Sequence, residues 1–134
     1  MKPRIFSLLA PFVLLTGCIT AANQGPKADH IVQQLNQAIQ QQQWAQAEAV
    51  FSDDFFKQTP KAYWEQEMKK LLKEKGAIKT VNVVSHQKDP RFGGDFYIYV
   101  LSIIHEHGTS HETVTIIQSI DSDKPMVVSG FQIK

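Results

Sequence analysis

Apolar residues between positions 29 and 51 recur at intervals of three and four, the spacing of one face of an α-helix. The first stripe predicts a helix from about His30 to Gln43, with Asp29 as its N-terminal cap. Its members are Ile31, Leu35, Ala38 and Ile39. Glutamines occupy most other positions, so we expect those faces to be solvated. The periodicity continues from Trp44 to Phe51 after a bend.

A further helix is predicted over Lys61 to Lys75. Pro60 precedes it at a position that favours proline, and Thr59 can act as a cap. Gly76 is a typical helix stop. The apolar stripe of this helix consists of Trp64, Met68, Leu71 and Leu72. Its lysines lie on the other side, which we expect to face water.

From residue 78 onward the polar and apolar positions alternate, which predicts β-strands. Four strands are expected, near Ile78–His86, Asp95–His107, His111–Ile120 and Met126–Ile133. Asp89 to Gly94 (DPRFGG) is predicted to be a turn. The second strand is apolar on both faces, so we expect it in the middle of the sheet. The order of elements predicts an α+β fold, with N-terminal helices packed on one face of a four-stranded antiparallel sheet.

The first eighteen residues follow a different pattern. Met1 to Arg4 is basic, Ile5 to Leu15 is apolar, and the small residues Thr16 and Gly17 precede the only cysteine, Cys18. This order is typical of a secretory signal, because the apolar run is too short to span a membrane. The stretch Leu15-Thr16-Gly17-Cys18 resembles the lipobox of bacterial lipoproteins.

The resemblance implies a signal peptide over residues 1–17, cleaved after Gly17, and a lipid chain attached to Cys18. It also implies that the protein is anchored to the outer membrane with its domain in the periplasm, because Ile19 rather than an aspartate follows the cysteine. Residues 18–27 are expected to be an acylated tether, since Gly25-Pro26 disfavours regular structure. Residues 28–134 are expected to form a single α+β domain.

Charge and cysteine content exclude two classes of protein. Lys2 and Arg4 belong to the predicted signal peptide, so 12 of the 14 basic side chains remain against 13 acidic ones. A nearly neutral domain gives no reason to expect nucleic-acid binding. A single cysteine also excludes a disulfide framework, so the stability of the domain must come from packing.

Three short motifs fall in the expected helices and strands. They are Trp44-x-x-Ala47-x-x-x-Phe51-Ser52, Leu71-Leu72-Lys73-Glu74-Lys75-Gly76-x-Ile78-Lys79-x-Val81 and Val127-Val128-Ser129-Gly130-Phe131. With the order of elements, they resemble small bacterial lipoproteins of unknown function that carry a nuclear-transport-factor-2-like (cystatin-like) domain. Members of that family often have Gly-Asp where this chain has Gln42-Gln43, and a tryptophan near Met126. The resemblance implies the α+β fold. It does not imply a pocket that depends on the family's tryptophan, because this chain lacks that residue.

The strand positions that we expect to face the helices carry no acid, which argues against the acid–base catalysis of isomerases and cyclases with this fold. These positions are Tyr97, Tyr99, Leu101, Ile103, Val114 and Ile116. Asp53 and Asp54 are expected at the end of a helix, in a cap or an exposed turn. We therefore predict no catalytic residue and no cofactor.

The segment His105 to Glu112 (HEHGTSHE) is the one cluster of potential metal ligands. A two-residue loop, Gly108-Thr109, pairs His105 with Glu112 and makes favourable charge partners across the strands. A three-residue loop pairs His107 with His111 and brings His105, His107 and His111 to one face, as a zinc, copper or nickel site requires. The charge pairing favours the two-residue loop over the metal site.

Three functions remain, in order of preference. The first is a non-enzymatic outer-membrane lipoprotein that acts through an envelope protein partner. The second is a periplasmic protein that binds a small ligand or a metal, and the third is an enzyme. Trp64, Tyr97, Tyr99 and Leu101 are the candidate residues for a ligand pocket or an interface, although core packing explains them equally well.

Replacing the lipobox cysteine, Cys18→Ser, is expected to abolish incorporation of radioactive palmitate. Without the thioether the protein should also leave the membrane fraction of the cell. Labelling that is unchanged in the variant would contradict the predicted anchor.

Overall fold

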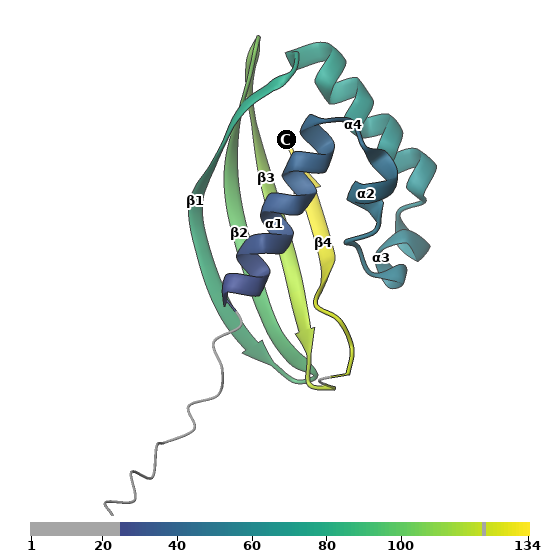
Figure 1. The fold of residues 1–134 in the computed structure, drawn as a ribbon, viewed down its shortest axis with the longest axis vertical. Helices are drawn as coiled ribbons and strands as arrows, with labels where there is room; N and C mark the ends of the chain where they lie inside the picture. Colours follow the sequence, from purple (N-terminus) through teal and green to yellow (C-terminus); the bar gives the residue numbers. More distant parts are fainter. Residues whose placement is uncertain (1–24, 122) are drawn as a thin grey trace, which may run out of the picture.

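The computed structural model describes residues 25–121 and 123–134, which form four helices and one four-stranded antiparallel sheet (Figure 1). The helices are α1 (Gly25–Gln40), α2 (Trp44–Glu48), α3 (Asp53–Gln58) and α4 (Lys61–Lys75). The strands are β1 (Ile78–Arg91), β2 (Gly94–His105), β3 (Gly108–Ser119) and β4 (Val127–Ile133). The predicted signal peptide, Cys18 and residues 19–24 lie outside the described residues. None of the described helices has the length and apolar character that a membrane span requires.

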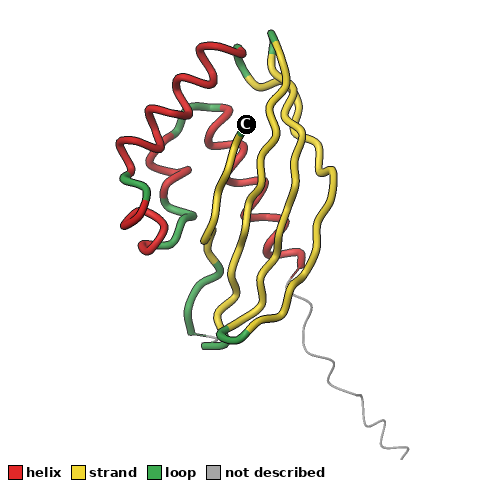
Figure 2. Tube along the Cα trace, turned by 180° about the vertical axis from the view of Figure 1, so that it is seen from behind, coloured by secondary structure: helices red, strands yellow, loops and turns green. Residues whose placement is uncertain are grey.

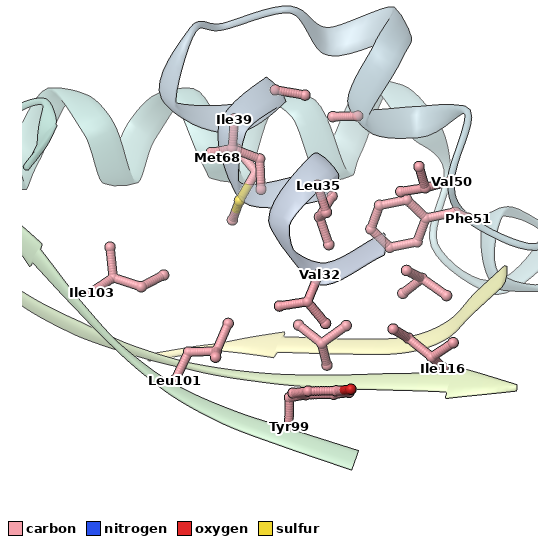
Figure 3. Close-up of a cluster of buried hydrophobic side chains, with 14 of the residues drawn as sticks. Val32, Leu35, Ile39, Val50, Phe51, Met68, Tyr99, Leu101, Ile103 and Ile116 are labelled. Carbon is pink, nitrogen blue, oxygen red and sulfur yellow. The ribbon is translucent and has the colours of Figure 1, made fainter. Parts of the chain in front are cut away.

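The sheet is a meander with the order β1-β2-β3-β4, and all four helices lie on one of its faces (Figure 2). The predicted α+β fold is therefore confirmed, as is the central position of β2. The inward-facing residues predicted from the alternation are all buried, and Tyr99, Leu101 and Ile103 of β2 are labelled in Figure 3. They are Tyr97, Tyr99, Leu101, Ile103, Val114 and Ile116.

Helices α1 and α4 supply the other half of the core. Helix α1 buries Val32, Leu35 and Ile39 against the sheet, and α4 buries Trp64 and Met68. Each buried side chain of this size contributes about 1.5–3 kcal/mol to folding. Around Trp64 the aromatic rings pack edge to face at centroid distances of 5.1–6.3 Å. These rings belong to Trp44, Phe51, Phe56 and Phe131.

Helix α1 begins at Gly25, five residues before the predicted start at His30. Gly25 to Lys27, which the sequence assigned to the tether, therefore form the first turn of the helix. Pro26 fits there because the first N–H groups of a helix have no partner within the helix. The earlier start places Asp29 inside the helix rather than at its cap.

Two further boundaries differ from the prediction. Strand β1 continues to Arg91, and only Phe92 and Gly93 form the turn, since Arg91 pairs with Gly94. Asp53 and Asp54 begin α3 rather than end the preceding helix, because Ser52 caps α3 by accepting a hydrogen bond from the Phe55 N–H at 3.2 Å. Carboxylates are favourable at this end of a helix.

The turn after α1 contains Gln42, the only described residue other than glycine with a positive φ, at 56°. Side chains with a Cβ atom cost about 1–2 kcal/mol in this left-handed conformation, and glycine does not. Gln42→Gly is therefore expected to raise the melting temperature by about 4 °C. Thermal unfolding followed by circular dichroism measures the change, and Gln41→Gly, a matched control whose φ is not positive, should lower the temperature instead.

Candidate functional site

A groove runs between α1 and the edge strand β1. Its helix wall carries Asp29, Gln33, Gln37 and Gln41, which are four residues apart and so lie along one face of the helix. Its strand wall consists of Val81, Val83, His86 and Lys88. Three cavities of about 490, 310 and 360 Å³ follow one another along it and share lining residues.

The floor of the groove comes from β2. Leu101 lines the cavity near the end of α1, and Tyr99 and Tyr97 line the cavities near its beginning. The hydroxyl group of Tyr97 is buried without a hydrogen-bond partner in the structure.

The middle of the groove is uncharged. Gln33, Gln37 and Gln41 supply amide donors and acceptors on one side, and Val83, which is 53% exposed, supplies an apolar surface on the other. The charged residues Asp29 and Lys88 lie near the beginning of α1. The distance from Asp29 to Gln41 along the helix axis is about 18 Å. A groove of this length accommodates about five residues of an extended chain.

Three side-chain hydrogen bonds fix α1 on the sheet beside this groove. The Tyr99 hydroxyl donates to Asp29 Oδ1 at 2.6 Å, and Gln40 Nε2 donates to the Ile78 carbonyl at 3.0 Å. Between them, Asn36 Nδ2 donates to Glu112 Oε1 at 3.1 Å. Burial, together with the bond to Asp29, raises the pKa of Tyr99 above its usual range, so this hydroxyl keeps its proton. The walls of the groove are thus held at a fixed spacing.

Glu112 is the inward-facing acid that the sequence analysis did not expect. Only 1% of its surface is exposed, and loss of hydration raises its pKa to about 7 although the bond from Asn36 opposes the shift. Glu112 Oε2 and Asn36 Oδ1 are both buried without a partner. One proton on Oε2 satisfies both atoms if the carboxyl and amide groups pair face to face. We therefore interpret Glu112 as the protonated half of an acid–amide pair.

The earlier statement that no acid stands on the inner face was wrong. Glu112 lies two residues before Val114 and four before Ile116, so the alternation that places those two inward also places Glu112 inward. The prediction that the glutamines of α1 are solvated is confirmed, since Gln33, Gln37 and Gln41 are exposed, and their spacing of four from Asp29 was the signal for a lined groove.

The four candidate pocket residues do not share one pocket. Tyr97, Tyr99 and Leu101 lie along the floor of the α1–β1 groove, whereas Trp64 packs in the aromatic cluster against Phe51 and Phe131. A pocket lined by Trp64, Tyr99 and Leu101 is therefore absent from the described part of the chain, because side chains of α1 fill the space above the sheet (Figure 3).

The histidine hairpin closes differently from both predicted loops. Its turn consists of Glu106 and His107, and His105 pairs with Gly108. The turn is fixed by the end of α4, since the Glu106 N–H donates to the Ala77 carbonyl at 3.0 Å and the His107 N–H to the Lys75 carbonyl at 2.8 Å. Gly76 permits this approach, because a Cβ there would lie 2.8 Å from the Glu106 Cβ.

The three imidazoles consequently do not share a face. His105 is 3% exposed, with Nδ1 3.0 Å from the Gly76 carbonyl oxygen and Nε2 2.8 Å from Ser110 Oγ. His107 lies in the turn, and His111 pairs with Ser102 on the outer face. Among the described residues no three potential ligands come close enough to hold a metal ion.

Two other hollows, of about 520 and 570 Å³, flank α3 at the opposite edge of the sheet. Both are lined by Asp54, whose exposed carboxylate pairs with Lys57 at 2.6 Å. Among the described residues, none of the buried polar atoms without a partner belongs to their walls. The α1–β1 groove is therefore the candidate site.

The raised pKa of Glu112 predicts how stability depends on pH. The folded protein holds this proton more tightly than the unfolded chain, so the free energy of unfolding should fall as the pH rises from about 4.5 to about 7. Because a glutamine amide can donate to Asn36 Oδ1 as the protonated acid does, Glu112→Gln should unfold like wild type at about pH 5 and be about 3 kcal/mol more stable at about pH 8. Urea denaturation at both pH values measures the difference.

The matched control is Glu106→Gln, which removes an exposed carboxylate from the β2–β3 turn and should keep the wild-type pH dependence. The same pH dependence in Glu112→Gln and wild type would show that Glu112 is ionised in the folded protein.

Comparison with known proteins supports the fold. No family model matches the chain, and no curated protein matches its sequence. The solved structure of Bdellovibrio bacteriovorus Bd1075 is similar to this one, with a TM-score of 0.56 and 13% sequence identity. The match covers 81% of this chain and 39% of that protein, so the chain spans well under half of its neighbour's length. At this identity the likeness establishes the helix-plus-antiparallel-sheet fold alone.

Proposed function

We propose that this protein is a lipid-anchored, non-enzymatic binding domain of the bacterial envelope whose α1–β1 groove holds an extended, uncharged segment of a partner protein. The groove is the observation that carries the proposal. It is long, preformed by the bonds that fix α1, and lined by amides opposite an apolar strand.

The spacing of the amides favours a polypeptide. Side chains four residues apart on a helix are separated by about 6 Å along its axis. Backbone groups that point the same way in an extended chain repeat every two residues, or about 6.7 Å. Gln33, Gln37 and Gln41 therefore match successive N–H and C=O groups of an extended segment, while Val83 contacts its side chains.

Binding in the groove is favoured over pairing with the free edge of β1. That edge carries irregularities between Ile78 and Thr80 and between Val83 and Ser85. It also carries Lys88 and Pro90. Bulges, lysines and prolines are the usual obstacles to edge-to-edge pairing.

The lipobox and the family resemblance support the remaining parts of the proposal. Acylated Cys18 would hold the domain at the outer membrane on its periplasmic side, and the architecture agrees with a nuclear-transport-factor-2-like (cystatin-like) lipoprotein. The proposal includes no catalytic step or cofactor, because the Ser110–His105 pair and the Glu112 carboxyl group are closed off from solvent.

In-cell crosslinking tests the groove. A photoreactive residue in place of Gln37 is expected to give a discrete adduct with an envelope protein, and the same residue in place of exposed Tyr63 on α4 should not. Val83→Arg should abolish the adduct by placing a charge in the uncharged groove. The matched control is Val84→Arg, because Val84 is 63% exposed but lies outside the groove, and it should leave the adduct unchanged.

Equal crosslinking from Gln37 and Tyr63 would contradict the proposal. If no protein adduct forms and native mass spectrometry of the soluble domain detects a bound small molecule, the groove holds a ligand rather than a partner segment.

A further inference from the structure

Two large apolar side chains are exposed together at one end of the sheet. Phe92, in the β1–β2 turn, is fully exposed, and Ile120, directly after β3, is 83% exposed. The two segments are joined, since the Ile120 N–H donates to the Gly93 carbonyl at 2.9 Å. At the opposite end the β2–β3 turn carries the polar residues Glu106 and His107. We call Phe92 and Ile120 the apolar tip.

The chain enters the domain at the end that carries the apolar tip. Helix α1 begins there (Figure 1). Gly25 and Pro26 line a cavity together with Lys88. Lys88 precedes Phe92 by four residues of strand, or about 13 Å. Cys18 precedes Gly25 by seven residues, which span at most about 25 Å. A lipid on Cys18 therefore allows the apolar tip to reach the membrane surface.

We infer that the apolar tip inserts into the interfacial layer of the membrane, as a second contact beside the lipid anchor; this inference rests on the proposed acylation of Cys18. Phenylalanine and isoleucine gain free energy by leaving water for the boundary between headgroups and acyl chains. Neither residue packs against the core of the domain, so nothing in the described fold requires them to be apolar.

Charge does not drive this contact. Arg91 is paired with Asp89 at 2.6 Å, and Lys124 follows Asp121 and Asp123 in the β3–β4 loop. A surface on which acids balance bases has little attraction for anionic lipids. Insertion is therefore insensitive to the fraction of anionic lipid and to salt, which distinguishes it from binding by a basic patch.

Insertion also orients the domain. The strands run away from the bilayer, and the α1–β1 groove extends from the membrane end of the sheet toward the Glu106–His107 turn (Figure 1). An extended segment in the groove would then run roughly along the membrane normal.

The test uses the acylated protein in vesicles of phosphatidylethanolamine and phosphatidylglycerol. Cys18 is the only cysteine and its sulfur is blocked by the lipid, so Phe92→Cys and Ile120→Cys each introduce a single reactive thiol. An environment-sensitive fluorophore at either position is expected to shift its emission to the blue and to be quenched by lipids with a nitroxide high in the acyl chain. The controls His107→Cys, in the far turn, and Val84→Cys, an exposed apolar position on β1, should show neither effect.

Ile120→Ser, introduced together with the label at position 92, should reduce the quenching there. Quenching at positions 92 and 120 that is no greater than at 107, while the protein still floats with the vesicles, would overturn the inference. A protein crosslinked in cells through position 92, without quenching in vesicles, would also overturn it and assign the apolar tip to a protein partner.

The two proposals fail in different ways. If Cys18 of the wild-type protein still reacts with a thiol reagent and the protein does not float, the lipid anchor is wrong. If the protein floats and the apolar tip is quenched but Gln37 gives no adduct, the partner-binding groove is wrong and the membrane contact stands.

Discussion

The hydrogen bond from Asn36 to Glu112 joins the first helix to the third strand across 76 residues of chain, inside a mainly apolar layer. Hydrophobic contacts alone hold a helix against a sheet without fixing where it lies, because burial has no directional preference. A buried polar pair has one satisfactory geometry, and leaving either group unpaired costs several kcal/mol. The position of α1, and with it the width of the groove beside β1, depends on this contact together with the bonds that Asp29 and Gln40 make to the sheet.

A chain segment is hydrogen-bonded to the β4 edge of the sheet but not to the described part of the β1 edge, and this difference leaves the groove beside β1. At the β4 edge the segment before α3 adds a parallel bridge, in which the Ser52 N–H donates to the Val128 carbonyl and the Val128 N–H to the Val50 carbonyl, each at 2.8 Å. Phe51 of this segment packs against Phe131 of β4 and Trp64 of α4, and Trp44 of α2 and Phe56 of α3 join the same cluster. At the β1 edge no such segment is present among the described residues, so α1 leaves the inner side of β1 uncovered.

The long axis of the sheet also has two unlike ends. One end combines the start of α1 with the apolar tip, and the other carries a polar turn bonded to the end of α4. The inferred membrane contact, the proposed anchor and the groove therefore follow one direction along the molecule. A lipid-anchored domain with this arrangement would present its groove to partners at a defined angle to the membrane.

Local patterns in the sequence were sufficient for much of the fold. The helix over Lys61–Lys75 and its stop at Gly76 were predicted correctly, because periodicity, a preceding proline and a following glycine all act within a few residues. Strand β2 is apolar on both faces, which was sufficient to predict its place inside the sheet. The succession of four strands joined by short loops was sufficient to predict a meander. The bend predicted after the first helix is also present, and Gln42 there adopts a left-handed conformation that favours glycine.

What the sequence by itself determined was which face the apolar residues of β2 and β3 occupy and where α4 begins and ends, since these follow from spacing along the chain. It did not determine the turn of the histidine hairpin, which is set by bonds to Lys75 and Ala77 about 30 residues away. Nor did it show that Glu112 meets Asn36, or that glutamines four residues apart line a groove with β1. Those features depend on how a helix is placed on a sheet, and contacts between residues far apart in the chain decide that placement.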